Sequence, residues 1–181
     1  MKIACIGWGS LIWDPKKLNI ATQWFEDGPL LPIELTRISK DKRVTFIIDE
    51  SAMNVPTLWA LMATDSLENA KESLKDREDT SIKNIHCIGK FDVPKGNVDL
   101  IIRDWLFIKG LDYAIWTGLS FSKKTQSDRP GIDLIINHLK DLTVDEKRKA
   151  EEYIRRAPAQ VNTEYRKLIE TEFGWYSINS R

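Results

Sequence analysis

Short apolar runs recur along the first 117 residues, and their pattern predicts a series of β-strands. Runs of this kind, bounded by glycine, proline or polar residues, are typical of buried strands. The segment 43–49 also combines β-branched and aromatic residues, which strands favour. The strands predicted from this pattern span residues 2–7, 31–38, 43–49, 57–63, 84–91, 98–108 and 112–117.

A helical period interrupts this series between residues 65 and 78. Asp65 precedes Glu68 by three positions, which is the spacing of a capping box at the start of a helix. Leu67, Ala70 and Leu74 then fall on one side of a helix with about 3.6 residues per turn. We therefore expect one helix between the fourth and fifth strands, ending near residue 78.

The last third of the chain is predicted to be helical. Apolar residues follow the i, i+3, i+4, i+7 pattern at Ile132, Ile135, Ile136 and Leu139. Thr143 and Glu146 form a second capping-box pattern, which predicts a charged helix ending near Arg156. Pro158 suits the first turn of a final helix with apolar positions at Val161, Tyr165, Leu168 and Ile169. Residues 123–129 are the most loop-like. Strands early and helices late predict an α+β fold.

Composition favours one globular domain and argues against several classes of partner. A chain of 181 residues is predicted to form a single domain over residues 1–181. Lysine plus arginine and aspartate plus glutamate number 27 each, so no charge excess favours nucleic acid or a membrane surface. No apolar run approaches the roughly 20 residues that span a bilayer, and the first residues do not resemble a secretory signal.

The cysteines and histidines predict neither a disulfide nor a metal site. Cys5 and Cys87 each lie in an apolar, strand-like run, which favours reduced structural thiols and a cytoplasmic protein. A disulfide between them is the alternative. His86 and His138 lack the neighbouring cysteine, histidine or acidic residues of a zinc site. We therefore expect no metal.

The most informative segment joins the first strand to a glycine-containing turn, Gly7-Trp8-Gly9-Ser10. Glycine permits backbone angles that other residues resist and lets a ligand approach the main chain. Successive amide groups in such a turn form a concave site for an anion. The alternative is a tight turn without a ligand. A nucleophile elbow and a dinucleotide fingerprint are both excluded, because Ile12 stands where each requires glycine.

Glu78 is the leading candidate for acid–base chemistry. It lies about 40° from Leu74 around the predicted helix, which places a carboxylate on the apolar face near the helix end. Partial desolvation of a carboxylate raises its pKa and makes it a better base. The alternative is a frayed helix end, with Glu78 pairing with a neighbouring cation.

Two segments resemble the gamma-glutamylcyclotransferase family, which includes ChaC-type and AIG2-like proteins. Residues 7–13, Gly-Trp-Gly-Ser-Leu-Ile-Trp, resemble the ChaC-type Gly-Tyr-Gly-Ser-Leu-Ile-Trp signature. Residues 74–78, Leu-Lys-Asp-Arg-Glu, are similar to the family's Leu-Asp-x-Arg-Glu form. Three positions depart from the family pattern. Trp8 replaces a tyrosine, Lys75 replaces the motif aspartate, and Asp79 stands where glycine often follows the glutamate.

This resemblance implies a fold, a reaction and a set of site residues. The implied fold is a small, mostly antiparallel β-barrel with helices packed around it. The implied reaction is cofactor-free cyclisation of a small-molecule γ-glutamyl amine or peptide to 5-oxoproline. Glu78 would be the general base that deprotonates the substrate α-amino group. The implied substrate-binding residues are Gly7, Trp8, Gly9, Ser10 and Leu11.

Two other functions stay open at this stage. The first is a non-catalytic small-molecule binding protein on the same fold, without the chemistry that the tyrosine supports. The second is a protein-interaction module without a ligand. The sequence does not predict the leaving amine or the oligomeric state.

Overall fold

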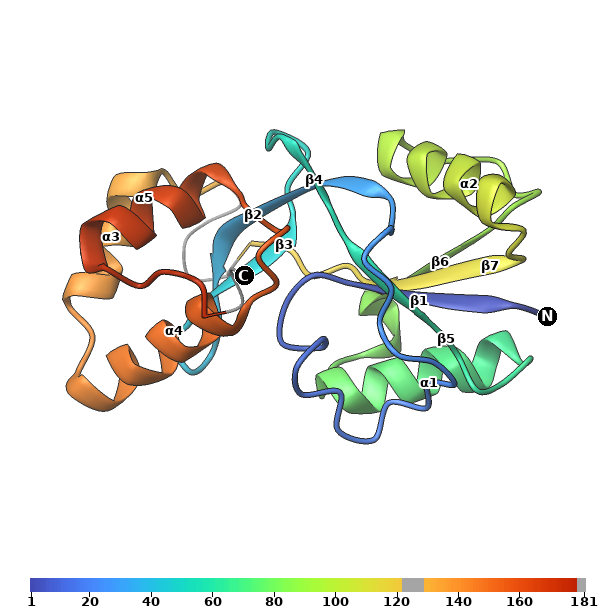
Figure 1. Cartoon of the computed structure of the whole chain (residues 1–181), viewed down its shortest axis with the longest axis horizontal. Helices are drawn as coiled ribbons and strands as arrows, with labels where there is room; N and C mark the ends of the chain where they lie inside the picture. Colours follow the sequence, from blue (N-terminus) through green and yellow to red (C-terminus); the bar gives the residue numbers. More distant parts are fainter. Residues whose placement is uncertain (122–128, 179–181) are drawn as a thin grey trace. The chain divides into compact units, whose positions relative to one another are not determined.

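The computed structural model describes residues 1–121 and 129–178, and the chain divides into two compact units (Figure 1). Unit 1 comprises Met1–Leu31 and Pro56–Gly118, and unit 2 comprises Pro32–Val55 and Leu119–Arg181. The expectation of a single domain over residues 1–181 stays a prediction. The loop predicted at 123–129 lies outside the described residues, except for Arg129.

Unit 1 is built on a four-stranded mixed sheet with the order β5-β1-β7-β6. Its strands are β1 (Ile3–Gly7), β5 (Leu58–Leu61), β6 (Ile85–Gly89) and β7 (Tyr113–Thr117). β1 is antiparallel to β5 and parallel to β7, and β6 is antiparallel to β7. β1 is therefore a central strand, and all five of its residues are buried. A short 3-10 turn, η1 (Ile82–Asn84), leads into β6.

Two helices cover opposite faces of this sheet, α1 (Leu67–Glu78) and α2 (Asn97–Lys109) (Figure 1). Strand side chains alternate between the faces, so Ile3 and Cys5 point to the same side. They join Ala70 and Leu74 of α1 in one buried cluster. Full burial of a leucine such as Leu74 stabilises the fold by about 1.5–3 kcal/mol. The predicted helix over 65–78 is confirmed, although its N-cap is Ser66, whose side chain accepts the amide N–H of Asn69.

The predicted strand over 98–108 is wrong, because these residues form most of α2. Glycines bound the helix, with Gly96 at its N-cap and Gly110 in the left-handed conformation after its last turn. The buried residues recur with helical spacing at Val98, Ile102, Trp105 and Leu106. The 3.6-residue period was hidden in the sequence because the exposed face of α2 also carries apolar residues.

The two cysteines lie on the same face of the unit 1 sheet but on different strands. Cys5 of β1 and Cys87 of β6 both pair with Ile115 of β7, from opposite sides. Two strand spacings separate their Cα atoms by about 10 Å, which is beyond the reach of a disulfide. Both thiols are free, as predicted.

The described residues of unit 2 form a three-stranded sheet and three helices. The strand order is β3-β2-β4, with β2 (Leu30–Ile38) antiparallel to β3 (Val44–Ile48), and β4 (Asn54–Pro56) beside β2. The helices are α3 (Ile132–Lys140), α4 (Val144–Arg156) and α5 (Glu164–Phe173). The predicted capping box is confirmed, since Thr143 is the N-cap of α4 and its amide N–H donates to Glu146 at 3.0 Å.

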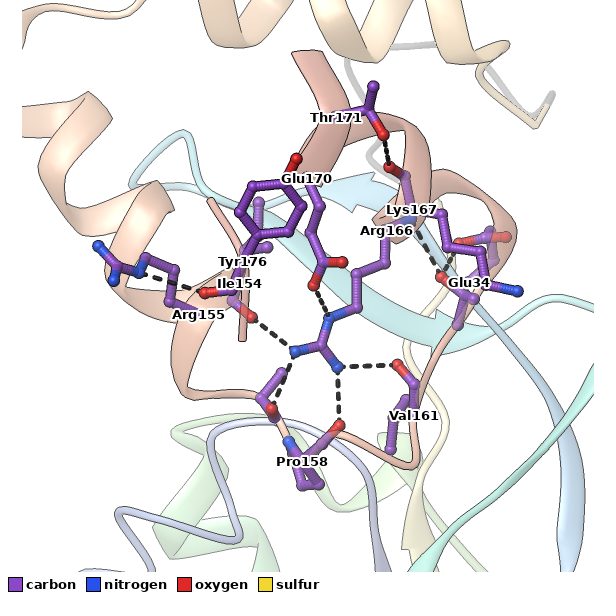
Figure 2. A network of polar contacts seen from close by, with 12 residues as sticks. Glu34, Ile154, Arg155, Pro158, Val161, Arg166, Lys167, Glu170, Thr171 and Tyr176 are labelled. Atoms are coloured by element: carbon purple, nitrogen blue, oxygen red, sulfur yellow. Dashed lines mark hydrogen bonds and ion pairs between the residues drawn. The ribbon is translucent and has the colours of Figure 1, made fainter. Parts of the chain in front are cut away.

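Pro158 does not begin the final helix, because α5 starts at Glu164. The chain between α4 and α5 is irregular, and the buried Arg166 side chain donates to carbonyl groups of this segment and of the last turn of α4 (Figure 2). The guanidinium also pairs with Glu170 at 3.0 Å. Burial lowers the pKa of Arg166, and the Glu170 carboxylate opposes that effect. The carbonyl oxygens that accept from Arg166 belong to Ile154, Ala157, Pro158 and Val161.

The buried Glu34 of β2 binds the start of α5. Its carboxylate accepts hydrogen bonds from the Thr163 hydroxyl and, at 3.2 Å, from the amide N–H of Tyr165. A carboxylate at a helix N-terminus is favoured by the helix dipole. Burial nevertheless raises the pKa of Glu34, while the hydrogen bonds from Thr163, Tyr165 and the Leu35 amide N–H and the charge of Arg129 act in the opposite direction.

The α+β class is confirmed, and six of the seven predicted strands are present within one to two residues of their predicted ends. The described strands form two separate sheets, and no closed barrel is found among them. Local patterns predict strands well, but barrel closure depends on pairings between distant segments, which local patterns do not encode.

Candidate functional site

The glycine-containing segment forms a loop directly after the central strand β1, as predicted. We call residues 8–14 the 8–14 loop. It closes on itself, since the Ile12 amide N–H donates to the Gly9 carbonyl at 3.0 Å and the Asp14 amide N–H donates to the Ser10 carbonyl at 2.9 Å. The Trp8 side chain is buried, and Ser10 is half-buried. The loop is therefore a defined turn whose beginning is packed into the core.

Packing leaves little room for a side chain at Gly7, and its backbone angle is not in the left-handed region. A Cβ at this position would lie 3.0 Å from Ile12 Cδ1, 3.2 Å from Leu11 Cδ2 and 3.3 Å from Trp24 Cη2. Among the described residues, the glycines with positive φ are elsewhere, at Gly110 and Gly174. Gly7 and Gly9 therefore do not use the left-handed backbone angles that glycine permits.

Glu78 is the last residue of α1 and lies on its inward side. Its side chain is 18% exposed, which agrees with the predicted position near the apolar face. Asp79 follows in the left-handed conformation with φ 47°, which closes the helix. Glycine adopts this conformation without the strain that a side chain brings. The left-handed conformation at position 79 thus gives a physical reason why glycine often follows the glutamate in the motif that residues 74–78 resemble.

Arg77 joins the 8–14 loop to the end of α1. Its side chain is only 6% exposed. The Nε and Nη2 atoms donate to the Asp14 carbonyl at 3.1 and 2.7 Å, and Nη2 also donates to Ser10 Oγ at 3.2 Å. Nη1 donates to Glu78 Oε1 at 2.9 Å. One guanidinium therefore holds both sequence motifs together, although 67 residues separate Ser10 from Arg77.

The electrostatics of β1 agree with this placement of the two charged side chains. Burial raises the pKa of the Cys5 thiol far above its usual value, and the negative charge of Glu78 raises it further. The positive charge of Arg77 opposes both effects. The two charges therefore act on the middle of the central strand. With its pKa raised in this way, the Cys5 thiol stays protonated and unreactive in the folded protein.

Sequence reasoning missed the role of Arg77. Arg77 is three residues after Leu74 and seven after Ala70, so helical periodicity puts it on the same buried face as these two residues. The residue appeared only as part of a motif. By contrast, Lys75 points away from this site and pairs on the helix surface with Glu72 and Asp76.

The site has no metal centre in the part of the chain that the structure describes. No group of three or more histidine, cysteine, aspartate or glutamate residues there has a geometry suited to a metal ion. None of the described helices is both long enough and apolar enough to cross a bilayer.

Comparisons with protein-family models, curated proteins and solved structures found no match to this chain.

Proposed function

We propose that this chain is a gamma-glutamylcyclotransferase-like enzyme that acts on a γ-glutamyl amine or peptide. The observation that carries the proposal is the Arg77 bridge between the two motifs. The resemblance pairs a loop after the first strand with a glutamate near residue 78, and both segments meet in unit 1 through direct contacts. If the two short motifs matched by chance, there would be no reason for them to lie in contact in the folded chain.

Glu78 has the role of general base in the proposed reaction. Its carboxylate takes a proton from the substrate α-ammonium group, and the freed amine attacks the γ-glutamyl carbonyl carbon. A new bond from the amine nitrogen to the γ-carbon closes the five-membered ring, that nitrogen gives up a second proton, and the original γ-amide C–N bond breaks. The leaving nitrogen takes up both protons, one of them returned by Glu78, and departs as an ammonium group. The products are 5-oxoproline and an amine or peptide. Arg77 stabilises the ionised carboxylate, which is the form that a general base needs.

The loop has the role of binding and orienting the substrate. The amides of Ile12 and Asp14 donate within the loop, so substrate contacts are assigned to the end of β1 at Gly7 and to the first half of the loop, as far as Leu11. Ring closure is intramolecular, and holding the amine against the carbonyl supplies much of the acceleration. Backbone donors aimed at the developing oxyanion supply a further part.

A non-catalytic small-molecule binding protein is the second candidate, and Trp8 favours it. The tryptophan occupies the position of the family's tyrosine, and its side chain is buried. An indole cannot replace a phenol hydroxyl as a proton donor and acceptor. If that hydroxyl is essential to turnover, the loop and Glu78 remain as a binding site.

The proposal includes the partner, compartment and finer fold that the resemblance implies. Equal numbers of acidic and basic residues support a small-molecule substrate over nucleic acid or a membrane surface. Two free thiols support a reducing, cytoplasmic compartment. The described strands pair as two sheets, so the barrel rests on the resemblance alone.

The test is a screen of γ-glutamyl amines, dipeptides and tripeptides, with two measurements on each compound. Release of 5-oxoproline reports turnover, and the thermal shift of the purified protein reports binding. Release of 5-oxoproline from any member supports the enzyme. Binding without release favours the second candidate. Neither binding nor release across the whole set would overturn both.

A further inference from the structure

The outer surface of α2 carries a concentration of exposed apolar side chains. Phe91, which precedes the helix and is 82% exposed, packs edge-to-face on Phe107 with ring centroids 5.7 Å apart. Apolar clusters on a surface commonly mark sites of protein association. The large apolar side chains exposed between residues 91 and 108 are Phe91, Val93, Leu100, Phe107 and Ile108.

Apolar and charged residues are ordered on this exposed face of α2. At about 100° per residue, Leu100 and Phe107 lie within about 20° of each other and define the centre of the face. Arg103 lies on one flank and Asp104 on the other, near the middle of the helix. In the single chain these two side chains form an exposed ion pair at 2.8 Å.

We propose that the exposed face of α2 binds a second copy of this chain, forming a two-fold dimer with the two α2 helices packed side by side and parallel. The apolar residues meet across the axis, Leu100 against Leu100 and Phe107 against Phe107. Arg103 of each copy lies against Asp104 of the other on both flanks of the contact. Each copy presents the same surface, as a closed two-fold interface requires.

The positions of the charges select both the partner and the orientation. A parallel two-fold pair brings one flank of the first helix against the opposite flank of the second, so arginine meets aspartate twice. An antiparallel pair brings identical flanks together, so Arg103 would meet Arg103 and Asp104 would meet Asp104. Like charges in contact are unfavourable, and flanking charge pairs are known to set helix orientation in this way.

Sedimentation equilibrium across micromolar to submillimolar concentrations tests the association. The wild type is expected to shift from 20.9 kDa towards twice that mass as concentration rises. Asp104→Arg and Arg103→Asp each place like charges in contact and are expected to weaken the dimer by about tenfold or more. The double swap Arg103→Asp/Asp104→Arg restores both pairs and is expected to restore association. Arg148→Asp, an exposed charge change on α4, is the matched control and should change nothing.

Oxidative cross-linking tests the orientation. Leu100→Cys alone and Phe107→Cys alone should each form disulfide-linked dimers, because a parallel pair sets each position against itself. Wild type controls for cross-linking through Cys5 and Cys87. Preferential cross-linking only in a mixture of the two variants would show an antiparallel pair and overturn the proposal. A wild type that stays monomeric at every concentration, or a double swap that fails to restore the dimer, would overturn it as well.

Discussion

Replacing Arg77 by alanine is the most informative perturbation of the site. The side chain donates to three acceptors, namely the Asp14 carbonyl, Ser10 Oγ and Glu78 Oε1. Alanine removes all of these donors and adds none. The three acceptors remain, two in the 8–14 loop and one at the end of α1, but nothing from position 77 joins them any longer. The variant therefore measures what the bridge between the 8–14 loop and α1 contributes.

The stability that Arg77→Ala is expected to lose depends on how deeply the remaining groups are buried. Removing one partner of a buried ion pair destabilises a protein by about 3–5 kcal/mol, because the other charge stays buried without its partner. Glu78 is 18% exposed, so water reaches part of its carboxylate and reduces that figure. The Asp14 carbonyl adds the smaller effect of a lost charge-assisted hydrogen bond. We expect Arg77→Ala to lower the free energy of unfolding by about 2–4 kcal/mol.

Urea unfolding followed by circular dichroism measures this change, and hydrogen exchange localises it. Arg77→Lys keeps the charge but loses the planar fork, so a loss of about 1–2 kcal/mol is expected. Arg148→Ala removes an arginine that is 75% exposed and should stay within about 0.5 kcal/mol of wild type. The amides of Ile12 and Asp14, which donate within the loop, should exchange faster in Arg77→Ala.

A second substitution separates the charge effect from general disruption. Glu78→Gln should destabilise the wild type, because it removes the partner of Arg77. In the Arg77→Ala background the same change should cost clearly less, because the ion pair that it disrupts is already gone. A loss below about 1 kcal/mol for Arg77→Ala, with unchanged exchange in the loop, would refute the bridging role. Destabilisation by Glu78→Gln of equal size in both backgrounds would refute the pairing.

Other predictions concern packing, pH and the thiols. Gly7→Ala should destabilise by about 1–3 kcal/mol in urea unfolding, since its Cβ would lie within 3.3 Å of three side chains, whereas Gly131→Ala meets no atom within 4 Å and should not destabilise. Comparable losses in both variants would contradict this reasoning. Because the folded-state pKa of Glu34 is raised above 4.5, its contribution to stability is fully present below pH 4.5 and is lost as pH rises through the raised pKa. The difference in unfolding free energy between wild type and Glu34→Gln should therefore fall over that window, and a rising difference would show the reverse shift. In denaturant, both Cys5 and Cys87 should be alkylated without prior reduction, as measured by intact mass, whereas in the native state Cys5 should react far more slowly. Failure of either thiol to label in denaturant would reveal a disulfide.

Local periodicity predicted most elements because each depends on residues close in sequence. The capping box at Thr143 and the inward face of α1 are examples, since a few residues settle each. The strand predicted over 98–108 was wrong for a related reason. When both faces of a helix carry apolar residues, the run loses its 3.6-residue contrast and resembles a buried strand. The glycines at 96 and 110 were the signals that would have corrected it.

The site was only partly predictable, because its key contacts join distant segments. The position of Glu78 followed from its angle to Leu74, and the loop after the first strand followed from its glycines. Nothing local shows that Arg77 would turn back to the loop and bind the Asp14 carbonyl, 63 residues earlier in the chain. The packing reason for Gly7 was equally hidden, since Trp24 contacts it from a separate segment.

The central claim is that the Glu78 carboxylate acts as a base beside the 8–14 loop, and turnover of a γ-glutamyl substrate tests it most directly. The measurement compares 5-oxoproline release by wild type, Glu78→Gln and Glu72→Gln, with thermal melts to verify folding. Glu72 lies on the same helix but is 52% exposed and pairs with Lys75, so its variant controls for loss of a carboxylate from α1. We predict that Glu78→Gln reduces turnover by about 100-fold or more while Glu72→Gln retains it. A folded Glu78→Gln protein with wild-type turnover would contradict the account.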